Sequence, residues 1–200
     1  MISPLPLQRG SGVQTPSAVA ILPVKMPAAM LDFTILTADN FHMFEKDILA
    51  SEEIFPENIR ESSESCLGTL ESTGGMGLVA FFQDRYLGNA LGFQPLGDVF
   101  TDLKLHEVYG EKRVNLIYLS NIVTLPEFQH KGFGRQLLKA FVDAAEKAGF
   151  NRVGGHFRCN GSLKNFKALG GQELASFDNW YDTGETYTYC DLALGDCRPA

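Results

Sequence analysis

Hydrophobic and polar residues follow two kinds of spacing along this chain. Short apolar or alternating runs predict strands at residues 31–36, 77–82, 85–93, 114–123, 152–157 and 186–194. Gln83-Asp84 predicts a hairpin turn between the second and third of these strands. The clearest helical spacing lies at residues 134–148, where positions 137, 138, 141, 142, 145 and 148 are apolar. Gly149 follows this segment as a typical C-terminal stop.

Capping and turn residues predict the remaining elements. Asp39 or Asn40 is suited to cap a first helix. The residues expected on the buried side of that helix are Phe41, Phe44, Ile48 and Leu49. Pro56 suits the first turn of a second helix that runs toward Leu70. A loop is expected at residues 97–110. A short helix is expected at residues 162–169, ended by Gly170-Gly171.

Residues 1–29 differ from the rest of the chain in composition. They contain five prolines, no acidic residue, and only Arg9 and Lys25 as charged residues. An acid-poor leader with serines is compatible with an organelle transit peptide, although this one is poor in Arg. A disordered tail, or a true start at Met26 or Met30, fits better. We expect a disordered N-terminal tail at 1–29 and a single domain at 30–200.

Composition and charge exclude several classes of protein. A chain of 200 residues with 44% hydrophobic content suits one globular domain with a full core. No apolar run approaches the roughly 18 residues of a membrane span. The net charge of −7 argues against a nucleic-acid-binding surface. The four cysteines form no Cys-x-x-Cys and have no histidines at zinc spacing, which indicates a reduced, cytoplasmic protein without a metal.

The segment Gln129-His130-Lys131-Gly132-Phe133-Gly134 carries the most specific chemistry. It joins an apolar strand to the amphipathic helix, and its glycines leave main-chain N–H groups open to a ligand. The start of the helix adds more N–H groups and the positive end of the helix dipole, which suits a diphosphate. A Walker A loop would need Lys and then Ser or Thr after the last Gly, and a dinucleotide fingerprint would need a third Gly at position 137. Neither is present. A structural turn that binds nothing is the alternative.

These six residues resemble the acetyl-CoA-binding motif of the GNAT superfamily of N-acetyltransferases, Gln/Arg-x-x-Gly-x-Gly/Ala, and the order of predicted elements agrees with that family. The resemblance implies an α/β (α+β) fold, with a mixed, mostly antiparallel central sheet flanked by helices on both faces. It also implies that the loop amides hold the pyrophosphate of coenzyme A and that the preceding strand pairs with the pantetheine arm. The cofactor-binding residues implied in this way are Ile122, Val123, Thr124, Gln129, His130, Lys131, Gly132, Phe133, Gly134, Arg135, Asn160 and Phe166.

The resemblance also indicates where catalytic residues would stand. Relatives with a side-chain base often carry Glu or His where this chain has Tyr118 and Ser120, which share one face of the strand. These two are the predicted catalytic residues. Because neither is a good base at neutral pH, we expect the proton to leave through a water chain. Many relatives have a Tyr as general acid at the position of Phe166, and Asn160 either touches pantetheine or acceptor or caps the helix near Ser162.

Four other residues are candidates for acid–base chemistry if the fold brings them close. The candidate bases are His106 and Glu107, and the candidate acids are Cys159 and Tyr181.

Acidic side chains gather between residues 45 and 64. They are Glu45, Asp47, Glu52, Glu53, Glu57, Glu61 and Glu64. A spacing of four predicts that Glu53, Glu57 and Glu61 share one helix face. That face would either attract a cationic amine or simply be solvated.

The sequence therefore predicts a cytoplasmic N-acetyltransferase. It moves the acetyl group of acetyl-CoA to a primary amine of a small molecule or protein in a direct ternary complex. We expect no metal, nucleic-acid or membrane partner, and a homodimer is possible. Two alternatives stay open: a non-catalytic acyl-CoA-binding sensor or scaffold, and a transferase of a longer acyl group.

Overall fold

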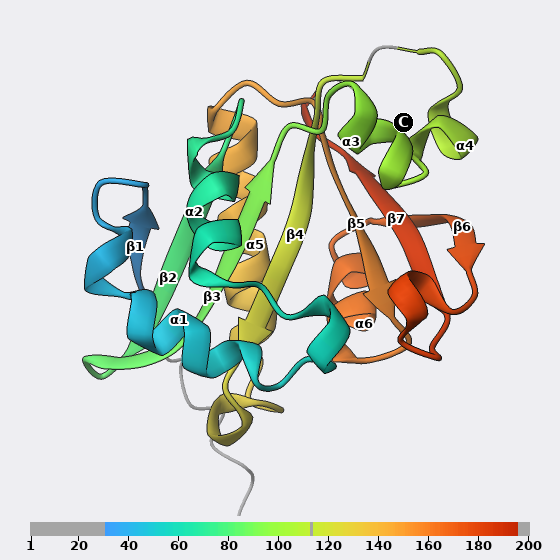
Figure 1. The fold of residues 1–200 in the computed structure, drawn as a ribbon. Helices are drawn as coiled ribbons and strands as arrows, with labels where there is room; N and C mark the ends of the chain where they lie inside the picture. The colour runs from blue at the N-terminus through green and yellow to red at the C-terminus, as the bar shows by residue number, and fades with distance from the viewer. Residues whose placement is uncertain (1–30, 113, 196–200) are drawn as a thin grey trace, which may run out of the picture.

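A seven-stranded sheet forms the centre of the protein (Figure 1), with the strand order β1-β2-β3-β4-β5-β7-β6. The computed structural model describes residues 31–112 and 114–195, so the tail expected at 1–29 lies outside the described residues. The strands are β1 (Asp32–Leu36), β2 (Met76–Phe82), β3 (Arg85–Phe93), β4 (Leu116–Thr124), β5 (Arg152–Arg158), β6 (Gln172–Phe177) and β7 (Tyr187–Ala193). Neighbouring strands are antiparallel except β4 and β5, which are parallel.

Helices cover both faces of this sheet, as the family resemblance implied. They are α1 (Glu45–Glu52), α2 (Ser63–Glu71), α3 (Asp98–Asp102), α4 (Leu105–Tyr109), α5 (Phe133–Lys147) and α6 (Gly161–Ala168). Successive residues of β2 show the two faces: Val79 packs with α1 and α2, whereas Leu78 and Ala80 pack with α5 and α6. In Figure 1, α2 lies in front of the sheet and α5 lies behind it.

The strongest sequence signals are confirmed. The apolar face of α5 is buried through Leu137, Leu138, Phe141, Val142 and Ala145. Ala148, expected on that face, is instead the exposed C-cap, and Gly149 ends the helix with a φ of +90°. Gln83 and Asp84 form the hairpin turn with φ values of +52° and +60°, as a two-residue turn with both φ positive requires.

The predicted start of the second helix is wrong. Pro56 precedes only a short 3-10 turn, η2 (Glu57–Ile59), and the chain is extended at Arg60. Helix α2 begins after Ser62, because the Ser62 side chain accepts a hydrogen bond from the Ser65 N–H at 3.1 Å. Consequently Glu53, Glu57 and Glu61 belong to different elements and do not share a helix face.

Two smaller predictions are also corrected. Asn40 caps no helix with its side chain, because its amide closes a turn instead: it accepts from the Thr37 N–H at 2.8 Å and donates to the Ile35 carbonyl at 2.9 Å. A 3-10 turn, η1 (Phe41–Met43), therefore precedes α1. Residues 97–110 are not a loop throughout, because they contain α3 and α4.

Strand β4 is irregular in its middle, around Ser120. Against β3, Leu91 pairs with Asn121 but Gly92 pairs with Leu119, so Ser120 is the extra residue of a β-bulge. Against β5, pairing covers only Leu116–Tyr118. Beyond Tyr118 the two strands separate, and Figure 1 shows the opening between them.

Candidate active site

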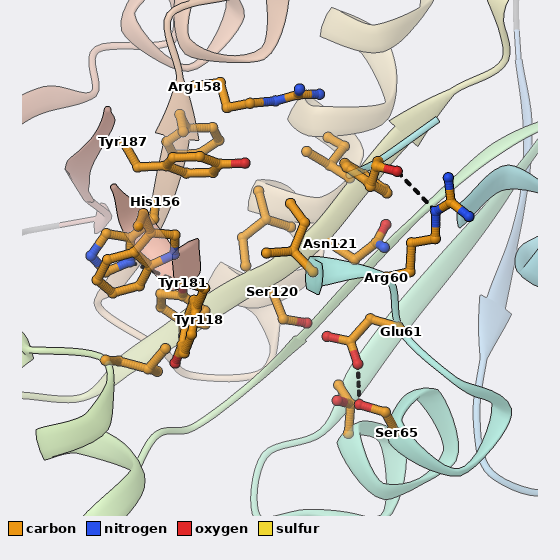
Figure 2. Close-up of a pocket in the computed structure, with 18 of the residues that line it drawn as sticks. Arg60, Glu61, Ser65, Tyr118, Ser120, Asn121, His156, Arg158, Tyr181 and Tyr187 are labelled. Carbon is orange, nitrogen blue, oxygen red and sulfur yellow. Dashed lines mark hydrogen bonds between the residues drawn. The ribbon is translucent and has the colours of Figure 1, made fainter. Parts of the chain in front are cut away.

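A cavity of about 500 Å³ lies where β4 and β5 separate (Figure 2). Four of the predicted site residues line it: Tyr118, Ser120, Ile122 and Asn160. The bulge turns Asn121 toward the same cavity, and β5 contributes His156. A volume of this size is typical of small-molecule sites.

The glycine loop stands beyond this cavity, at the start of α5. Gly132 is the helix N-cap with a φ of +83°, and no side chain caps the helix. The first turn of α5 contains no acidic residue, whereas Lys131 and Arg135 are exposed beside it. Uncapped amides, the helix dipole and two cations fit the diphosphate of coenzyme A.

Side chains of the loop are held by main-chain carbonyls. The Gln129 amide donates to the Thr124 carbonyl at 2.9 Å, and the Lys131 ammonium donates to the Glu127 carbonyl at 2.7 Å. Arg135 donates to the Ala168 carbonyl at 3.2 Å, at the end of α6. His130 is exposed with a φ of +60°. These bonds fix the loop against the end of β4 and against α6.

Three of the predicted cofactor residues carry side chains that do not face a ligand. Phe133 is buried against Phe82, with ring centroids 4.9 Å apart, so only its main chain belongs to the loop. Val123 is buried as well. Phe166 is 0% exposed and packs on Phe157 in the core. It does not line the cavity, so its predicted place beside the leaving sulfur has no support.

Gly134 and Asn160 stand where a ligand could approach. A Cβ on Gly134 would come within 3.1 Å of Thr124 Oγ1, so this position is already closely surrounded. Asn160 caps α6 by accepting from the Ser162 N–H at 2.9 Å, and it also lines the cavity. Both interpretations of Asn160 therefore remain compatible with its position.

Tyr118 forms a buried pair with His156. The Tyr118 hydroxyl and His156 Nδ1 lie 2.9 Å apart, and the imidazole stacks on Trp180 at 3.9 Å. Burial, with a further contribution from the Lys104 charge, lowers the pKa of His156 to about 3. Burial raises the pKa of Tyr118 well above its ordinary value. Both side chains are consequently neutral at pH 7.

A second cluster of buried polar side chains contacts the bulge through Asn121. The Asn121 amide donates to the Glu52 carboxylate, and the Asn89 amide donates to Asn121 Oδ1 at 3.2 Å. Glu52 also accepts from the Glu61 N–H at 2.9 Å. Burial raises the pKa of Glu52 to about 7, although the two hydrogen bonds favour its charged form. Glu52 thus connects α1, β4 and the segment before α2.

The sequence comparison identifies the family of this chain. The model of the acetyltransferase (GNAT) family matches residues 40–166. The chain belongs to the GNAT family of acetyltransferases. It is accordingly an acyltransferase, and the match includes both the glycine loop and the strand with the bulge.

Solved structures share the fold of this GNAT enzyme at low sequence identity. The ribosomal-protein-S18-alanine N-acetyltransferase from Escherichia coli is 17% identical with a TM-score of 0.60, covering 86% of this chain and 100% of that chain. A mosquito arylalkylamine N-acetyltransferase like 5b is 13% identical with a TM-score of 0.62, covering 82% and 100%. An Elizabethkingia anophelis GNAT acetyltransferase with acetyl-CoA bound is 15% identical with a TM-score of 0.57, covering 82% and 98%. No curated protein sequence matches this GNAT enzyme significantly.

The remaining sequence candidates divide between the cavity and the surface. Tyr181 and Glu61 line the cavity. His106 and Glu107 are exposed on α4, and Cys159 is exposed before α6; none of the three lines the cavity. Among the described residues, no cluster of three metal-binding side chains occurs, and no helix is both long and apolar enough to cross a membrane.

Sequence reasoning missed His156, Trp180, Asn121 and Glu52. A single histidine within a strand carries no spacing signal, and its pairing with Tyr118 depends on β4 and β5 being neighbours. The role of Asn121 depends on the bulge, which shifts the alternation of side chains by one residue.

Proposed function

We propose that this GNAT enzyme moves the acetyl group of acetyl-CoA to a primary amine while both reactants are bound. The observation that carries the proposal is the opening between β4 and β5. Strand β4 leads from the cavity to the diphosphate loop, because Ile122 lines the cavity and Thr124 lies against Gly134. A single ligand with a diphosphate at one end and a reactive group at the other suits this arrangement.

The edge of β4 supports the reactive arm of such a ligand. Beyond Tyr118 this edge has no pairing with β5, so its main-chain groups are available to the amides of pantetheine. Acetyl-CoA supplies the acetyl group, which passes to the acceptor nitrogen as an amide forms and the CoA thiol leaves. A main-chain N–H near residues 122–124 is suited to stabilise the thioester oxygen, because charge develops there during attack.

Tyr118 has a hydroxyl proton to donate, whereas Phe166, at the position where many relatives have a tyrosine as general acid, has none. Its high pKa keeps the hydroxyl of Tyr118 protonated, and in the tautomer with a proton on Nδ1, His156 donates to the Tyr118 oxygen and leaves the Tyr118 hydrogen available to the ligand. We assign Tyr118 to donate a hydrogen bond to the sulfur as it leaves. The neutral His156 orients Tyr118. One proton of the ammonium passes to water before attack, and a second leaves the nitrogen after attack and reaches the departing thiolate through solvent.

Direct transfer is favoured over a covalent acyl-enzyme. The hydroxyl of Ser120 donates to the Leu91 carbonyl at 3.3 Å, and among the described residues it forms no hydrogen bond with a basic side chain. Cys159 lies outside the cavity lining. An activated nucleophile needs a base within hydrogen-bond reach.

Initial-rate kinetics test this proposal. Varying acetyl-CoA at several fixed amine concentrations should give intersecting reciprocal plots, as a ternary complex requires. Parallel plots, together with an isolated acetylated enzyme, would contradict direct transfer. Longer acyl thioesters in the same assay measure the acyl preference. The cytoplasmic location and the homodimer expected from the sequence stay predictions.

A further inference from the structure

The side of the cavity away from the diphosphate loop is mostly apolar. Its walls come from η2 and the residues before it, from β3, from α3 and from η4 (Trp180–Asp182). The apolar side chains that face it there include Phe55, Ile59, Phe93, Val99, Leu103 and Tyr181. Val99 and Tyr181 line the cavity and are 44% and 53% exposed, so apolar surface stands at its entrance.

A hydrogen bond joins the two sides of the cavity at this end. The Asn58 amide donates to the Tyr181 carbonyl at 2.7 Å, so η2 and η4 meet across the cavity. An extended polypeptide needs a groove open at both ends. A small molecule needs only a pocket, and the Asn58–Tyr181 bond makes the site a pocket.

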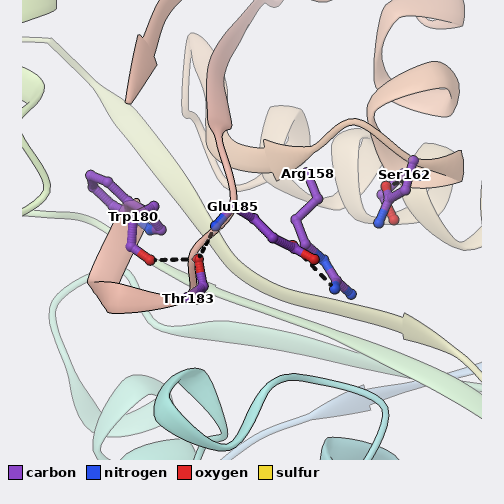
Figure 3. A network of polar contacts seen from close by, with 6 residues as sticks. Arg158, Ser162, Trp180, Thr183 and Glu185 are labelled. Atoms are coloured by element: carbon purple, nitrogen blue, oxygen red, sulfur yellow. Dashed lines mark hydrogen bonds and ion pairs between the residues drawn. The ribbon is translucent and has the colours of Figure 1, made fainter. Parts of the chain in front are cut away.

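The η4 side of this closure is held firmly. Tyr181 has a φ of +46°, a value that bulky residues rarely adopt. The turn is fixed by Thr183, whose hydroxyl donates to the Trp180 carbonyl at 2.8 Å and accepts from the Glu185 N–H at 3.3 Å (Figure 3). Backbone strain of this kind persists where the surrounding structure enforces it, and it often occurs at functional sites.

The charge inside the pocket suits an ammonium group. Glu61 and Ser120 line the same cavity (Figure 2), and the Glu61 carboxylate accepts a hydrogen bond from the uncharged Ser65 hydroxyl. Within residues 31–112 and 114–195, no cationic side chain forms an ion pair with Glu61. The two arginines of the lining are engaged elsewhere: Arg158 pairs with Glu185 at 3.4 Å, and Arg60 donates to the carbonyls of Phe55 and Glu53.

We infer that the acceptor is a small primary amine on an aromatic body, with its ammonium at Glu61 and its ring between Ile59 and Tyr181. The inference rests on the proposed function and specifies its substrate class. The carboxylate attracts the ammonium and holds the nitrogen near Ser120, where the thioester would end. Aromatic rings favour the apolar wall and stack on the Tyr181 ring.

An amine panel tests the substrate class. With saturating acetyl-CoA, kcat/KM for 2-phenylethylamine and tryptamine should exceed that for spermidine and for a short peptide with a free N-terminus by at least about tenfold. Equal or better turnover of the peptide or spermidine would overturn the aromatic class but leave the proposed function intact. Absence of turnover with every amine would instead overturn the proposed function.

Binding without chemistry separates these outcomes further. Trp180 is the single tryptophan of the chain and lies in the cavity lining, so its fluorescence reports occupancy directly. In the presence of CoA, 2-phenylethylamine should change this fluorescence saturably, whereas spermidine should not. No saturable change with any aromatic amine would overturn the inference, whatever the turnover results.

Glu61→Gln tests the ammonium contact, because glutamine keeps an acceptor for Ser65 without the charge. It should weaken 2-phenylethylamine binding at least tenfold and leave the binding of the uncharged analogue 2-phenylethanol unchanged. Glu57→Gln is the matched control, since Glu57 is exposed on η2 and does not line the cavity. Unaltered amine affinity in a folded Glu61→Gln protein, or an equal loss for 2-phenylethanol, would overturn the assignment of Glu61.

Discussion

Tyr118 and His156 are the two polar side chains that meet at the point where β4 and β5 begin to separate. The pair is neutral at pH 7, because burial raises the pKa of Tyr118 and lowers that of His156 to about 3. Because the Tyr118 hydroxyl stays protonated, it can donate a hydrogen bond to the negative charge that develops on the sulfur. This property suits stabilisation of a leaving sulfur more than proton abstraction from an ammonium.

Tyr118→Phe removes this donor while it keeps the ring that packs on Phe93. We expect kcat to fall about 10- to 100-fold, because loss of one donor aimed at a developing charge has effects of this order. The KM for acetyl-CoA should change little. Steady-state kinetics measure both constants.

Tyr187→Phe is the matched control for that experiment. Tyr187 lines the same cavity, and its hydroxyl has no hydrogen-bond partner in the part of the chain that the structure describes. Its kcat should stay within about twofold of the wild-type value. An equal fall of kcat in both variants would contradict a specific role for the Tyr118 hydroxyl, because loss of any hydroxyl from the cavity would then have the same effect.

The burial of Phe166 could not be predicted from the sequence. Family resemblance gave the position of this residue on its helix, but not the depth of the helix in the fold. Because Phe166 is fully buried against Phe157, a tyrosine there would bury a hydroxyl in the core, which typically costs about 1–3 kcal/mol if it is unpaired.

At the scale of elements, the start of α5 is the clearest link between sequence and function. The glycines, the uncapped amides and the absence of acidic residues in the first turn all favour an anion. Most strands and the long helix followed from periodicity and turn residues, whereas α3, α4 and β6 did not. The bulge and the separation of β4 from β5 did not, because both depend on pairing between distant residues.

Gly134→Glu should weaken CoA binding by more than tenfold. The new carboxylate would face the phosphate charge, and its Cβ would crowd Thr124. Gly134→Gln is the control of equal size, and it should lose much less affinity because only the crowding remains. Calorimetry with CoA measures both, and equal losses would contradict the charge argument.

Glu52 makes a pH-dependent contribution to stability. Its pKa is about 7 in the folded protein and 4.5 in an ordinary environment, so the folded state binds this proton more tightly than the unfolded state. The stability that Glu52 contributes is therefore full below pH 4.5 and is lost as the pH rises through 7. Charged Glu52 is still held by Asn121 and the Glu61 N–H, so the cost is limited to a few kcal/mol at most.

Glu52→Gln removes this titration. We expect the free energy of unfolding of the wild type, relative to the variant, to decrease between pH 5 and pH 8. Denaturant unfolding at several pH values measures the difference. A difference that is constant, or that increases with pH, would show that Glu52 keeps an ordinary pKa in the folded protein.

At the scale of the whole molecule, the same opening in the sheet organises both halves of the site. The glycine loop, proposed to bind the diphosphate, lies at the end of β4, and the wall proposed to hold the acceptor lies toward η2, α3 and η4. The first half could be predicted from the sequence because its residues are contiguous. The second half could not, because the pocket walls come from segments more than a hundred residues apart, such as Asn58 and Tyr181.

The sequence and the fold say least about which amine accepts the acetyl group. Structural relatives include an enzyme for a ribosomal-protein alanine and an arylalkylamine N-acetyltransferase-like protein, so the fold alone does not select the acceptor. The regular acidic helix face predicted from spacing does not exist. A single carboxylate from that run, Glu61, reaches the cavity.

The most direct test of acetyl transfer combines CoA release with the mass of the product. Purified protein is incubated with acetyl-CoA and 2-phenylethylamine, and the initial rate of CoA release is compared with the appearance of N-acetylated amine by mass spectrometry. The account predicts equal amounts of both, dependent on the amine, with a strongly reduced rate for Tyr118→Phe. Saturable CoA binding without acetylated amine from any member of the panel would contradict it.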